Sequence, residues 1–451
     1  MNVRAIVLAA GKGTRMKSAT PKVLHDLCGR PMLWYTLREL RAAGIDDVLV
    51  VTNDELQARI GEFDVRGIVQ HEQLGTGHAV KIALEATPGQ TASKVVVAYG
   101  DMPLIPHDIF VRIVAALDGG EPAAMSLATV KMPLPSNFGR IVRNKHDEVE
   151  RIVEVRDAEP HELAIDEMNA GIYAFEETGL REAVAALKND NAQEEYYLTD
   201  TVEHFVRAGK RVRPVLVADH LQTLGINDRV ELALARQEMN ARLAAAHMRQ
   251  GVTIVDPATT YLEPELAIGS DTVIYPNTSI SLLTTIGERC VIGPNTRISD
   301  ARIGDRVEIR ESVVVQSEIG SETKIGPFAH IRGHARLDGE NRVGNFVEVK
   351  NAHYARGVKS AHLAYLGDAE IGEESNIGAG TITCNFDGQQ KNRTTIGKNV
   401  SIGSNTSIVA PRTIGDGALT GAGSVVTRDV APGERVAGNP AKRLPKTEST
   451  S

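Results

Sequence analysis

The sequence predicts two domains of different fold class: a doubly wound α/β domain, followed by an all-β domain in the form of a parallel β-helix. In the first half of the chain, short apolar runs alternate with helical stretches, which is typical of a mainly parallel sheet covered by helices. In the second half, branched aliphatic residues recur every six positions. Neither an α-helix nor a flat strand sustains that period, whereas a coil of short strands does.

The composition of the 451-residue chain is that of a globular protein with two or three domains. Its hydrophobic content of 42% allows each domain a core, and its formal net charge of −8 argues against nucleic acid or an anionic membrane as the main partner. No apolar stretch approaches the roughly 18 residues of a membrane span. Cys28, Cys290 and Cys384 form neither a metal motif nor a disulfide framework, so we expect a soluble cytoplasmic protein.

The first domain is expected over residues 1–225 and opens with a predicted buried strand, since Val3–Ala9 is an almost continuous apolar run. Further strands are predicted over Asp47–Thr52 and Lys94–Tyr99. In such sheets ligands bind beyond the carboxyl ends of the strands. A helix is predicted over residues 31–43 from an apolar stripe made of Leu33, Trp34, Leu37 and Leu40.

A glycine-rich loop follows the first strand and is the first chemical signal. Gly11 and Gly13 let the backbone approach a phosphate, and Lys12, Arg15 and Lys22 add positive charge. An ammonium group about 4 Å from a phosphate oxygen gains roughly 4 kcal/mol at an effective dielectric near 20, so the loop could hold a triphosphate. It matches neither the dinucleotide-binding nor the Walker motif. The alternative is an ordinary glycine turn with solvated lysines.

Asp101 is expected at the carboxyl end of the strand over Lys94–Tyr99. A carboxylate there suits Mg²⁺, a hard ion that takes oxygen ligands together with substrate phosphates. The alternative is an aspartate that merely closes the strand in a turn.

A linker over residues 226–250 is predicted to contain a helix, over 226–247, that acts as a rigid strut, because it is rich in strong helix formers. Asn227 or Asp228 could cap its start, and Gly251 could end it. A surface helix of the first domain is the alternative. The apolar stripe of the helix is expected to comprise Val230, Leu234, Met239 and Leu243.

The second domain, over residues 251–451, is predicted from a ladder of inward-pointing residues. Each short strand would place one branched residue inside and then turn a corner, where a following glycine permits the bend. Such an interior carries no chemistry, so a functional site is expected where the register breaks. The ladder comprises Ile268, Ile274, Ile280, Ile286, Ile292 and Ile298, then Ile319, Ile325, Ile331, Leu337, Val343 and Val349, and finally Ile396, Ile402, Ile408 and Ile414.

The register breaks over Lys350–Tyr365 and again over Thr381–Thr395. The first break is interpreted as an insertion that is dense in histidine, lysine, arginine and tyrosine. On chemistry alone, either His353 or His362 could act as a base near pH 7, and the alternative is a solvated loop histidine. The polar residues after Leu444 are expected to be disordered.

Several motifs resemble those of a known family. LAAGKGTRM at residues 8–16, followed by Pro21-Lys22, resembles the signature of sugar-1-phosphate nucleotidylyltransferases. With the six-residue repeat, the chain resembles, over residues 3–436, the bifunctional N-acetylglucosamine-1-phosphate uridyltransferases / glucosamine-1-phosphate N-acetyltransferases. The other matching segments are EQLGTGHA at 72–79, YGDMPL at 99–104, FGRI at 138–141, IVE at 152–154, NAG at 169–171 and NAQEEYYLTD at 191–200.

This resemblance implies a Rossmann-like nucleotidyltransferase domain, a left-handed β-helix and two reactions. The second domain would acetylate glucosamine 1-phosphate with acetyl-CoA. The first would then transfer uridylate from UTP to N-acetylglucosamine 1-phosphate, with Mg²⁺ as cofactor and pyrophosphate as by-product. The product would supply peptidoglycan and lipopolysaccharide precursors.

For uridylyl transfer, the attacking phosphate oxygen is already ionised, so alignment and charge neutralisation are needed rather than a base. The resemblance implies that Lys12, Arg15 and Lys22 supply this catalytic charge. The implied contacts are Leu8, Ala9, Ala10, Gly11, Lys22, Tyr99 and Gly100 for the nucleotide, Gln70, Gly75 and Thr76 for the uracil, Gly139, Glu154 and Asn169 for the amino sugar, and Asp101 and Asn227 for the metal.

For acetyl transfer, the resemblance selects His362 as the proton acceptor. Because related proteins are trimers, it also implies a homotrimer formed through the β-helix, with site residues borrowed between subunits. The implied contacts are Arg332, Lys350, Tyr365 and Asn376 for the glucosamine phosphate, Asn385 and Phe386 beside the amine and the cofactor, and Ala379, Ser404, Ala422 and Asn439 for acetyl-CoA.

The chain departs from the family pattern at four places. Phe386 stands where tyrosine is usual, so one hydroxyl contact is lost. Gly333-His334 replaces Pro-Gly, Ala170 replaces a common threonine, and residues 438–442 resemble generic hexapeptide acyltransferases, which leaves the tail contacts to CoA open.

Two other functions compete with the bifunctional enzyme. One is a single-activity nucleotidylyltransferase for another sugar or base, whose β-helix only assembles the protein; the segment with His362 speaks against it. The other is a non-enzymatic subunit of a nucleotide-exchange factor. Lys12, Arg15, Lys22 and Asp101 speak against that reading.

Overall fold

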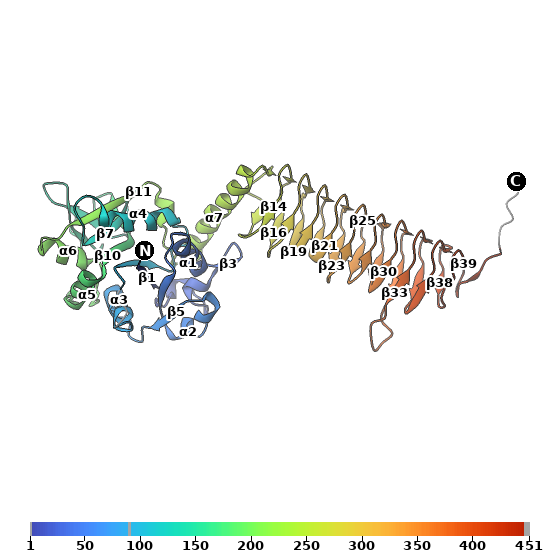
Figure 1. Ribbon diagram of the computed structural model, residues 1–451, viewed down its shortest axis with the longest axis horizontal. Helices are drawn as coiled ribbons and strands as arrows, with labels where there is room; N and C mark the ends of the chain where they lie inside the picture. The colour runs from blue at the N-terminus through green and yellow to red at the C-terminus, as the bar shows by residue number, and fades with distance from the viewer. Residues whose placement is uncertain (1, 89–91, 446–451) are drawn as a thin grey trace. The chain divides into compact units, whose positions relative to one another are not determined.

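The computed structural model describes residues 2–88 and 92–445, and the chain divides into two compact units, Met1–Met239 and Asn240–Ser451 (Figure 1). The division falls inside one long helix, α7 (Arg229–Arg249). From residue 446 on, the polar tail for which disorder is expected lies outside the described residues. In the described ranges, no helix combines the length and the apolar character needed to cross a bilayer.

The first unit is built on a mixed sheet with the strand order β11-β7-β10-β6-β1-β4-β5. An interior strand, β1 (Val3–Leu8), pairs in parallel with β4 (Asp47–Thr52) and β6 (Lys94–Tyr99), which confirms the three predicted strands. One strand, β10, runs antiparallel to β6 and β7. The other strands of the unit are β2 (Asp26–Leu27), β3 (Arg30–Pro31), β5 (Arg66–Val69), β7 (Met125–Lys131), β8 (Arg140–Arg143), β9 (Val149–Val153), β10 (Glu167–Glu176) and β11 (Val212–Val217).

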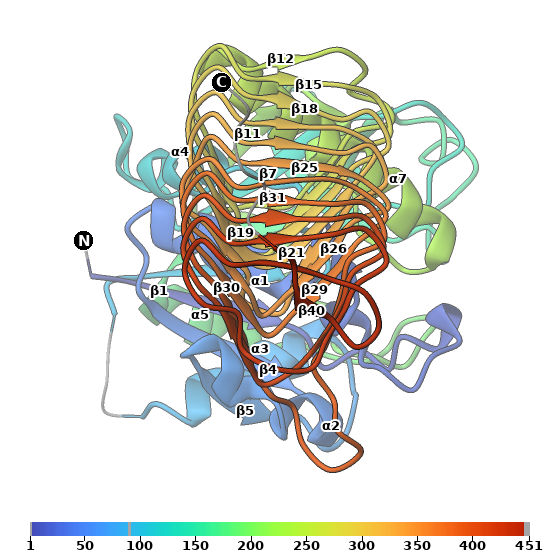
Figure 2. The same cartoon turned by 90° about the vertical axis from the view of Figure 1, so that its right-hand side faces the viewer.

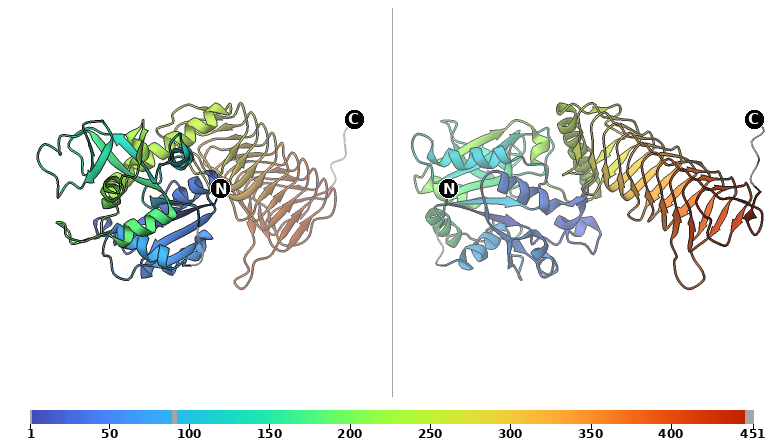
Figure 3. Two further views of the ribbon diagram at one scale, coloured as in Figure 1. Left: turned by 60° about the vertical axis from the view of Figure 1, so that its left-hand side comes forward. Right: turned by 45° about the vertical axis from the view of Figure 1, so that its right-hand side comes forward.

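Helices cover both faces of this sheet (Figure 3), because β1 alternates its side chains between two apolar clusters. Ala5 and Val7 share one cluster with α1 (Met32–Ala42) and α4 (His107–Asp118). The helix predicted over 31–43 and the doubly wound fold class are therefore confirmed. On the opposite face, Ile6 and Leu8 share a cluster with α3 (Thr76–Glu85), α5 (Glu177–Ala185) and α6 (Asp200–Arg207).

Helix α7 has a cap and a terminating glycine that were predicted, but it covers Arg229–Arg249 instead of 226–247, and part of its buried face is different. Asp228 caps it by accepting from the backbone N–H groups of Val230 and Glu231, at 2.8 and 2.9 Å, and Gly251 follows its end with a φ of 94°. Of the predicted stripe, Met239 is buried and Leu243 packs against the core. Val230 is 69% exposed and Leu234 is 53% exposed, so the first half of the stripe was wrong. The helix carries apolar residues on more than one face, and the buried ones are Leu232, Ala235, Met239 and Ala244.

The second unit is a left-handed parallel β-helix whose coils stack along one axis (Figure 2). Every residue of the predicted ladder is at most 7% exposed, which confirms the ladder. One sheet comprises β12 (Thr253–Ile254), β15 (Val273–Ile274), β18 (Val291–Ile292), β20 (Glu308–Ile309), β22 (Lys324–Ile325), β25 (Arg342–Asn345), β28 (Lys359–His362), β31 (Asn376–Ile377), β34 (Ser401–Ile402), β37 (Leu419–Thr420), β39 (Arg435–Ala437) and β40 (Lys442–Arg443).

A second, longer sheet forms the other walls of the coils. It comprises β13 (Tyr261–Leu262), β14 (Ala267–Ile268), β16 (Ser279–Ser281), β17 (Thr285–Ile286), β19 (Arg297–Ile303), β21 (Val313–Ile319), β23 (His330–Arg332), β24 (Arg336–Leu337), β26 (Glu348–Lys350), β27 (His353–Tyr354), β29 (Tyr365–Gly367), β30 (Ala369–Ile371), β32 (Ile382–Cys384), β33 (Thr394–Ile396), β35 (Ser407–Val409), β36 (Arg412–Ile414) and β38 (Val425–Val426).

Most glycines that follow the ladder residues have a different role from the one predicted, although Gly293 and Gly326 do turn the chain, with φ values of 95° and 106°. Left-handed backbone is adopted at many corners by other residues, such as Asp271 and Arg289, with φ values of 59° and 55°. A Cβ on Gly287 would lie 2.7 Å from the backbone carbon of Gly304 in the next coil, and one on Gly344 would lie 1.9 Å from the oxygen of Ala361. These glycines are therefore needed because stacked coils approach closely, not because the chain bends.

The first break in the register is not an insertion. The coil continues through it, with Tyr354, Ser360 and Leu366 fully buried in place of the branched residues. The hydroxyl groups of Tyr354 and Ser360 lie 3.1 Å apart and satisfy each other inside the coil. The true excursion belongs to the second break, between β32 and β33, where a loop leaves the stack beside β33 (Figure 1).

Candidate functional site

A cavity of about 360 Å³ in the first unit gathers most of the predicted nucleotide contacts. Its walls include Gly11, which follows β1, and Asp101, which follows β6, so it lies beyond the carboxyl ends of parallel strands. Gly100 lies behind this wall, where a Cβ would be 3.3 Å from that of Ala9. The predicted contacts that the cavity brings together are Leu8, Ala9, Ala10, Gly11, Lys22, Gln70, Gly75, Thr76, Tyr99, Asp101 and Asn227.

A rigid polar edge lines one side of the cavity. Gln70 is only 5% exposed. Its Nε2 atom donates to the Gly75 oxygen at 3.2 Å and lies 3.2 Å from Nδ1 of His78. Gly75 has a φ of 105°, and a Cβ there would lie 2.7 Å from the Tyr196 oxygen. The orientation of the Gln70 amide is therefore fixed before any base binds, which suits recognition of a nucleobase edge.

Two oxygen ligands converge on one cation at the floor of the cavity. The Lys22 ammonium contacts the Asp101 carboxylate and donates to Oδ1 of Asn227 at 3.2 Å. The Lys22 and Asp101 side chains are 15% and 16% exposed. The backbone N–H of Ile226 donates to the Asp101 oxygen at 3.0 Å, which ties the two ligand-bearing segments together. A carboxylate and an amide oxygen aimed at one point are the hard donors that Mg²⁺ prefers.

A second cavity, of about 620 Å³, adjoins the first and shares Tyr99, Asp101 and Asn227 with it. Glu154, Asn169 and Gly139, predicted to hold an amino sugar, line it. Asn169 donates from Nδ2 to the Tyr173 hydroxyl at 2.7 Å. Burial raises the pKa of Glu154, although the Thr199 hydroxyl donates to it at 3.2 Å. Burial likewise raises the pKa of Tyr99, which keeps its hydroxyl neutral.

The structure separates the three predicted catalytic cations. Lys22 lines the first cavity and Arg15 lines the second. Lys12 is exposed and is not among the described residues that line either cavity. Two polar residues that line the first cavity, Gln73 and Glu195, were missed by the sequence reasoning. Gln73 donates to the Ala10 oxygen at 2.7 Å and so braces the glycine-rich loop.

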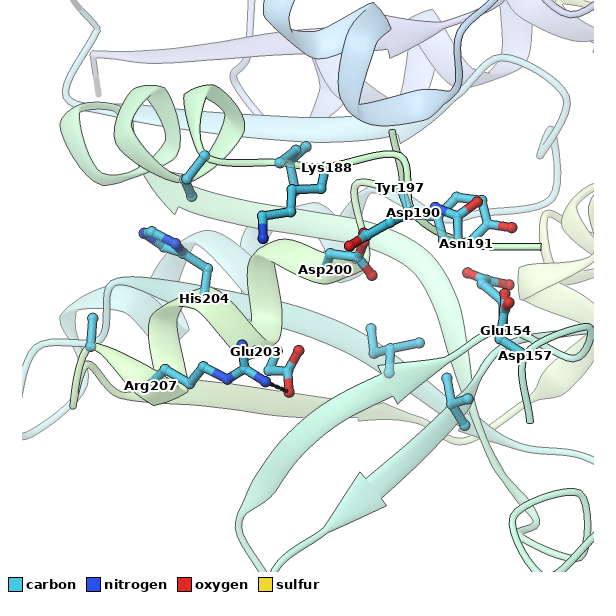
Figure 4. Close-up of a pocket in the computed structure, with 16 residues that line it drawn as sticks. Glu154, Asp157, Lys188, Asp190, Asn191, Tyr197, Asp200, Glu203, His204 and Arg207 are labelled. Atoms are coloured by element: carbon cyan, nitrogen blue, oxygen red, sulfur yellow. Dashed lines mark hydrogen bonds and ion pairs between the residues drawn. The ribbon is translucent and has the colours of Figure 1, made fainter. Parts of the chain in front are cut away.

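An acidic cavity of about 680 Å³ lies on the other side of Glu154 (Figure 4). Glu154 lines both this cavity and the predicted sugar cavity. Asp200 points into it beside Glu203 and Tyr197 (Figure 4). Burial, followed by repulsion from Glu203 and Glu154, raises the pKa of Asp200 to about 6.

We expect Asp200→Asn to stabilise the first unit more at pH 7.5 than at pH 4.5. The raised pKa means that the stability this carboxyl contributes is lost as the pH rises through about 6, because the charged form is disfavoured in the fold. Solvent screens this partly exposed group, and the dipole of α6 favours its charge, so we discount the effect of the pKa shift. The expected gain in the free energy of unfolding is about 1 kcal/mol, or roughly 3 °C in unfolding temperature. Scanning calorimetry at the two pH values measures it. A larger gain at pH 4.5 would contradict the assignment.

In the second unit, the predicted base and three predicted acetyl-CoA contacts form a straight column. Asn345 on β25 pairs directly with His362 on β28. In the next coils, Ser360 is the ladder partner of Ile377, and Ile377 is that of Ile402. The residues two positions after these, His362, Ala379 and Ser404, are therefore in line. Ala422 follows in the next coil by the same spacing. Small side chains therefore line one edge of the β-helix beyond His362 and leave it open to an extended ligand.

A cationic cluster lies on the second wall of the same coils. Arg332 on β23 is the ladder partner of Lys350 on β26, and its guanidinium forms an ion pair with Glu348 at 2.5 Å. The neighbouring Lys391 lowers the pKa of Lys350 more than any other group does. Two adjacent ammonium groups favour a bound anion between them, such as a phosphate. Lys391 was missed by the sequence reasoning, because it belongs to the loop between β32 and β33.

Tyr365 and Asn385 lie beside this cluster. Asn385 Nδ2 donates to the Asp368 carboxylate at 2.5 Å and lies 3.4 Å from the Tyr365 hydroxyl. Asn351 donates to the other oxygen of Asp368 at 2.5 Å. The loop that begins at Asn385 is therefore fixed to the preceding coils. Its next residue, Phe386, is 62% exposed.

The chain by itself does not bring all the predicted acetyl-transfer residues together. Asn376 is on β31 in the first sheet of the β-helix, whereas Lys350 and Tyr365 are on the second. Asn439 is exposed and follows Gly438, one coil after Ala422.

Comparison with known proteins identifies the chain. The family model of the MobA-like NTP transferase domain matches residues 5–252, and that of the bacterial transferase hexapeptide (six repeats) matches residues 283–317 and 393–428. The chain is 46% identical over 437 residues to the "Bifunctional protein GlmU" of Mycolicibacterium gilvum, covering 95% of this chain and 88% of that protein. It is 44% identical to the protein of that name from Halalkalibacterium halodurans, covering 94% of both. The chain belongs to the family of bifunctional GlmU proteins.

Proposed function

We propose that this bifunctional enzyme makes UDP-N-acetylglucosamine in two steps. The second unit acetylates glucosamine 1-phosphate with acetyl-CoA, and the first unit transfers uridylate from UTP to the N-acetylglucosamine 1-phosphate so formed. The observation that carries this proposal is the pair of adjoining cavities that share Tyr99, Asp101 and Asn227. One has the fixed polar edge suited to a base, and the other has the side chains suited to an amino sugar.

Uridylyl transfer in the first unit depends on alignment and charge. The phosphate oxygen of the sugar is ionised at neutral pH and attacks the α-phosphorus of UTP, the bond to the leaving pyrophosphate breaks, and no base is required. The shared wall at Tyr99 holds the two substrates against each other. Lys22 and Arg15 face this junction from the two cavities and offset the charge that develops there.

Asp101 and Asn227 fit a bound Mg²⁺. Their oxygens already converge on one cationic atom, Nζ of Lys22. Because Mg²⁺ takes only one or two protein carboxylates and fills its shell with water and phosphate oxygens, one carboxylate and one amide are sufficient. The bound ion supplies charge neutralisation at the α-phosphate and the leaving pyrophosphate. Lys22 is then free to turn from Asp101 toward a phosphate.

Acetyl transfer in the second unit needs a proton acceptor. The amine nitrogen of glucosamine 1-phosphate attacks the thioester carbonyl carbon, the carbon–sulfur bond breaks, and the amine proton passes to His362, which can return it to the thiolate of CoA. The column of small residues through Ala379, Ser404 and Ala422 accommodates an extended thioester arm. Lys350, Lys391 and Arg332 provide the counter-charge for the sugar phosphate.

The assay that tests the function follows both products. Purified protein is given acetyl-CoA with glucosamine 1-phosphate, and release of CoA is measured. Separately it is given UTP, Mg²⁺ and N-acetylglucosamine 1-phosphate, and release of pyrophosphate is measured. Activity in both assays supports the proposal. Pyrophosphate release alone would favour the single-activity nucleotidylyltransferase, and activity in neither would favour a non-enzymatic subunit.

We also propose that the protein forms a homotrimer through the β-helix. It would act in the cytoplasm, where both co-substrates are made. The placement of Asn376 on a different sheet from Lys350 supports a site shared between chains. An apolar ridge made of Phe328, Phe346 and Leu363 supports it as well. The two rings stack 5.5 Å apart at successive corners, and the three side chains are 54%, 56% and 60% exposed. This ridge runs directly beside His362.

We expect Phe346→Glu to separate the subunits and to lower CoA release by more than about tenfold, because a charge in a closed apolar interface is costly. Pyrophosphate release should stay within about twofold. Sedimentation velocity, combined with both assays, measures the effect. Tyr261→Glu is the matched control, since Tyr261 is also 56% exposed but lies in the first coils. A fully active monomer, or an intact trimer without acetyl transfer, would contradict the shared site.

A further inference from the structure

His362 is held by one side chain from the coil before it. Oδ1 of Asn345 lies 2.7 Å from Nδ1 of His362, and the two residues are direct partners in the ladder between β25 and β28. His362 itself is exposed, so packing alone does not fix the orientation of its ring. The contact with Asn345 is the restraint that sets the ring angle.

We propose that Asn345 is a positioning residue for acetyl transfer, an inference that rests on the proposed function. An amide oxygen can only accept, so His362 donates its Nδ1–H to Asn345. The neutral ring then carries its lone pair on Nε2. That is the tautomer a proton acceptor needs, because Nε2 is the ring atom left facing away from the protein contact. Asn345 thus selects both the tautomer and the direction in which the ring accepts.

The amide suits this role better than a carboxylate does. A carboxylate at the same position would also accept from Nδ1, but it would favour the imidazolium form, which cannot take up a proton. A hydroxyl group could donate instead of accepting, which would leave the tautomer unspecified. Asn345 combines an obligate acceptor oxygen with zero charge, so the ring is oriented and stays neutral.

The backbone around Asn345 keeps this contact short. A Cβ on the preceding residue, Gly344, would lie 1.9 Å from the Ala361 oxygen, so glycine is what allows the two strands to lie at ladder distance here. The following residue, Phe346, turns the corner with a φ of 58° and stacks on Phe328. The side chain of Asn345 is therefore delivered to His362 by a segment that is fixed on both sides.

The test is a comparison of Asn345→Leu and Asn345→Asp in the full-length protein. Leucine matches asparagine in size but removes the acceptor. We expect N345L to lower kcat for CoA release about 10- to 100-fold, with KM for acetyl-CoA and for glucosamine 1-phosphate within about twofold. N345D retains the acceptor, but its charge favours the imidazolium form, so it should recover most of the lost kcat at pH 9, where the ring is neutral again, and much less at pH 7. Pyrophosphate release and the thermal unfolding profile should match those of the wild type in both variants.

Combination with His362→Ala separates positioning from a merely structural role. If Asn345 acts only through the ring, N345L should cost nothing further in an H362A background. An additive loss in the double variant, an equal change in KM, or an N345L protein as active as the wild type would overturn the inference. A wild type that releases no CoA from acetyl-CoA would overturn the proposed acetyltransferase function and the inference with it.

Discussion

Replacing Asp101 with alanine is expected to lower pyrophosphate release by about 10³-fold or more while CoA release stays unchanged. Among the described residues, Asp101 is the one carboxylate that lines both cavities, and it shares the Lys22 ammonium with Asn227. Without it, the proposed Mg²⁺ site loses its charged protein ligand, and Lys22 keeps only its contact with Asn227. The charge on the transferred phosphate is then poorly offset. Initial rates at saturating Mg²⁺ measure the effect.

Asp108→Ala is the matched control for this change. Asp108 is exposed in the first turn of α4, in the same unit. Its replacement should leave both rates within about twofold. A second test is Mg²⁺ dependence: D101A should need much more Mg²⁺ for any residual activity, whereas D108A should follow the wild type. Loss of CoA release in D101A, or undiminished pyrophosphate release, would contradict two separate sites.

Replacing His362 with alanine is expected to lower CoA release by about 10²- to 10⁴-fold, which is the usual contribution of a positioned base. Pyrophosphate release from UTP and N-acetylglucosamine 1-phosphate should be unaffected, because that site lies in the other unit. The pair of assays on one preparation measures both rates, so the unaffected activity serves as the internal check on folding.

His353→Ala is the control that the chain itself offers. The segment 350–365 contains both histidines, and chemistry alone did not choose between them. The structure distinguishes their surroundings. His353 is on β27, where its two ring nitrogens lie 2.8 and 3.0 Å from carboxylates of Asp338 and Glu370. Both nitrogens are occupied, so H353A should keep at least about half of the CoA release. A larger loss in H353A than in H362A would reassign the base.

Local apolar patterns predicted most of the fold because burial acts on each strand separately. Val3–Leu8 is enclosed on both faces and therefore reads as a continuous apolar run. The six-residue ladder likewise reports one buried residue per short strand. Where a buried position is polar, the pattern fails. Tyr354 and Ser360 satisfy each other inside the coil, so their stretch had the appearance of an insertion.

Other errors arose because amino-acid type does not reveal which neighbour a residue meets. Glycine after a ladder residue suggested a bend, but the next coil, some 17 residues further on, decides its role. On α7, apolar residues occur around the helix, and only packing selects Leu232 over Val230. Lys391 and Asn345 escaped notice for the same reason. Asn345 contacts its partner in the next coil, and Lys391 approaches its partner from a loop. No local sequence motif indicates either pairing.

The nucleotide contacts that the first cavity brings together were predicted in a different way. Their residue types alone were weak evidence, and the resemblance of whole motifs to a family supplied the grouping. The sheet explains why the grouping holds in space: residues that follow β1 and β6 in sequence meet at one edge because those strands are parallel neighbours.

The column that runs from His362 through Ala379 and Ser404 to Ala422 has a consequence for how such a protein can change. Neighbouring strands are spaced by about 4.8 Å, so the three steps of the column span roughly 14 Å. A whole coil can be added or removed without disturbing its neighbours, since each coil meets only the two beside it. If the column holds the thioester arm as proposed, the length of arm that fits changes by a whole strand spacing at a time. Evolution or design can therefore lengthen the column by one whole coil at a time, but not by part of a coil.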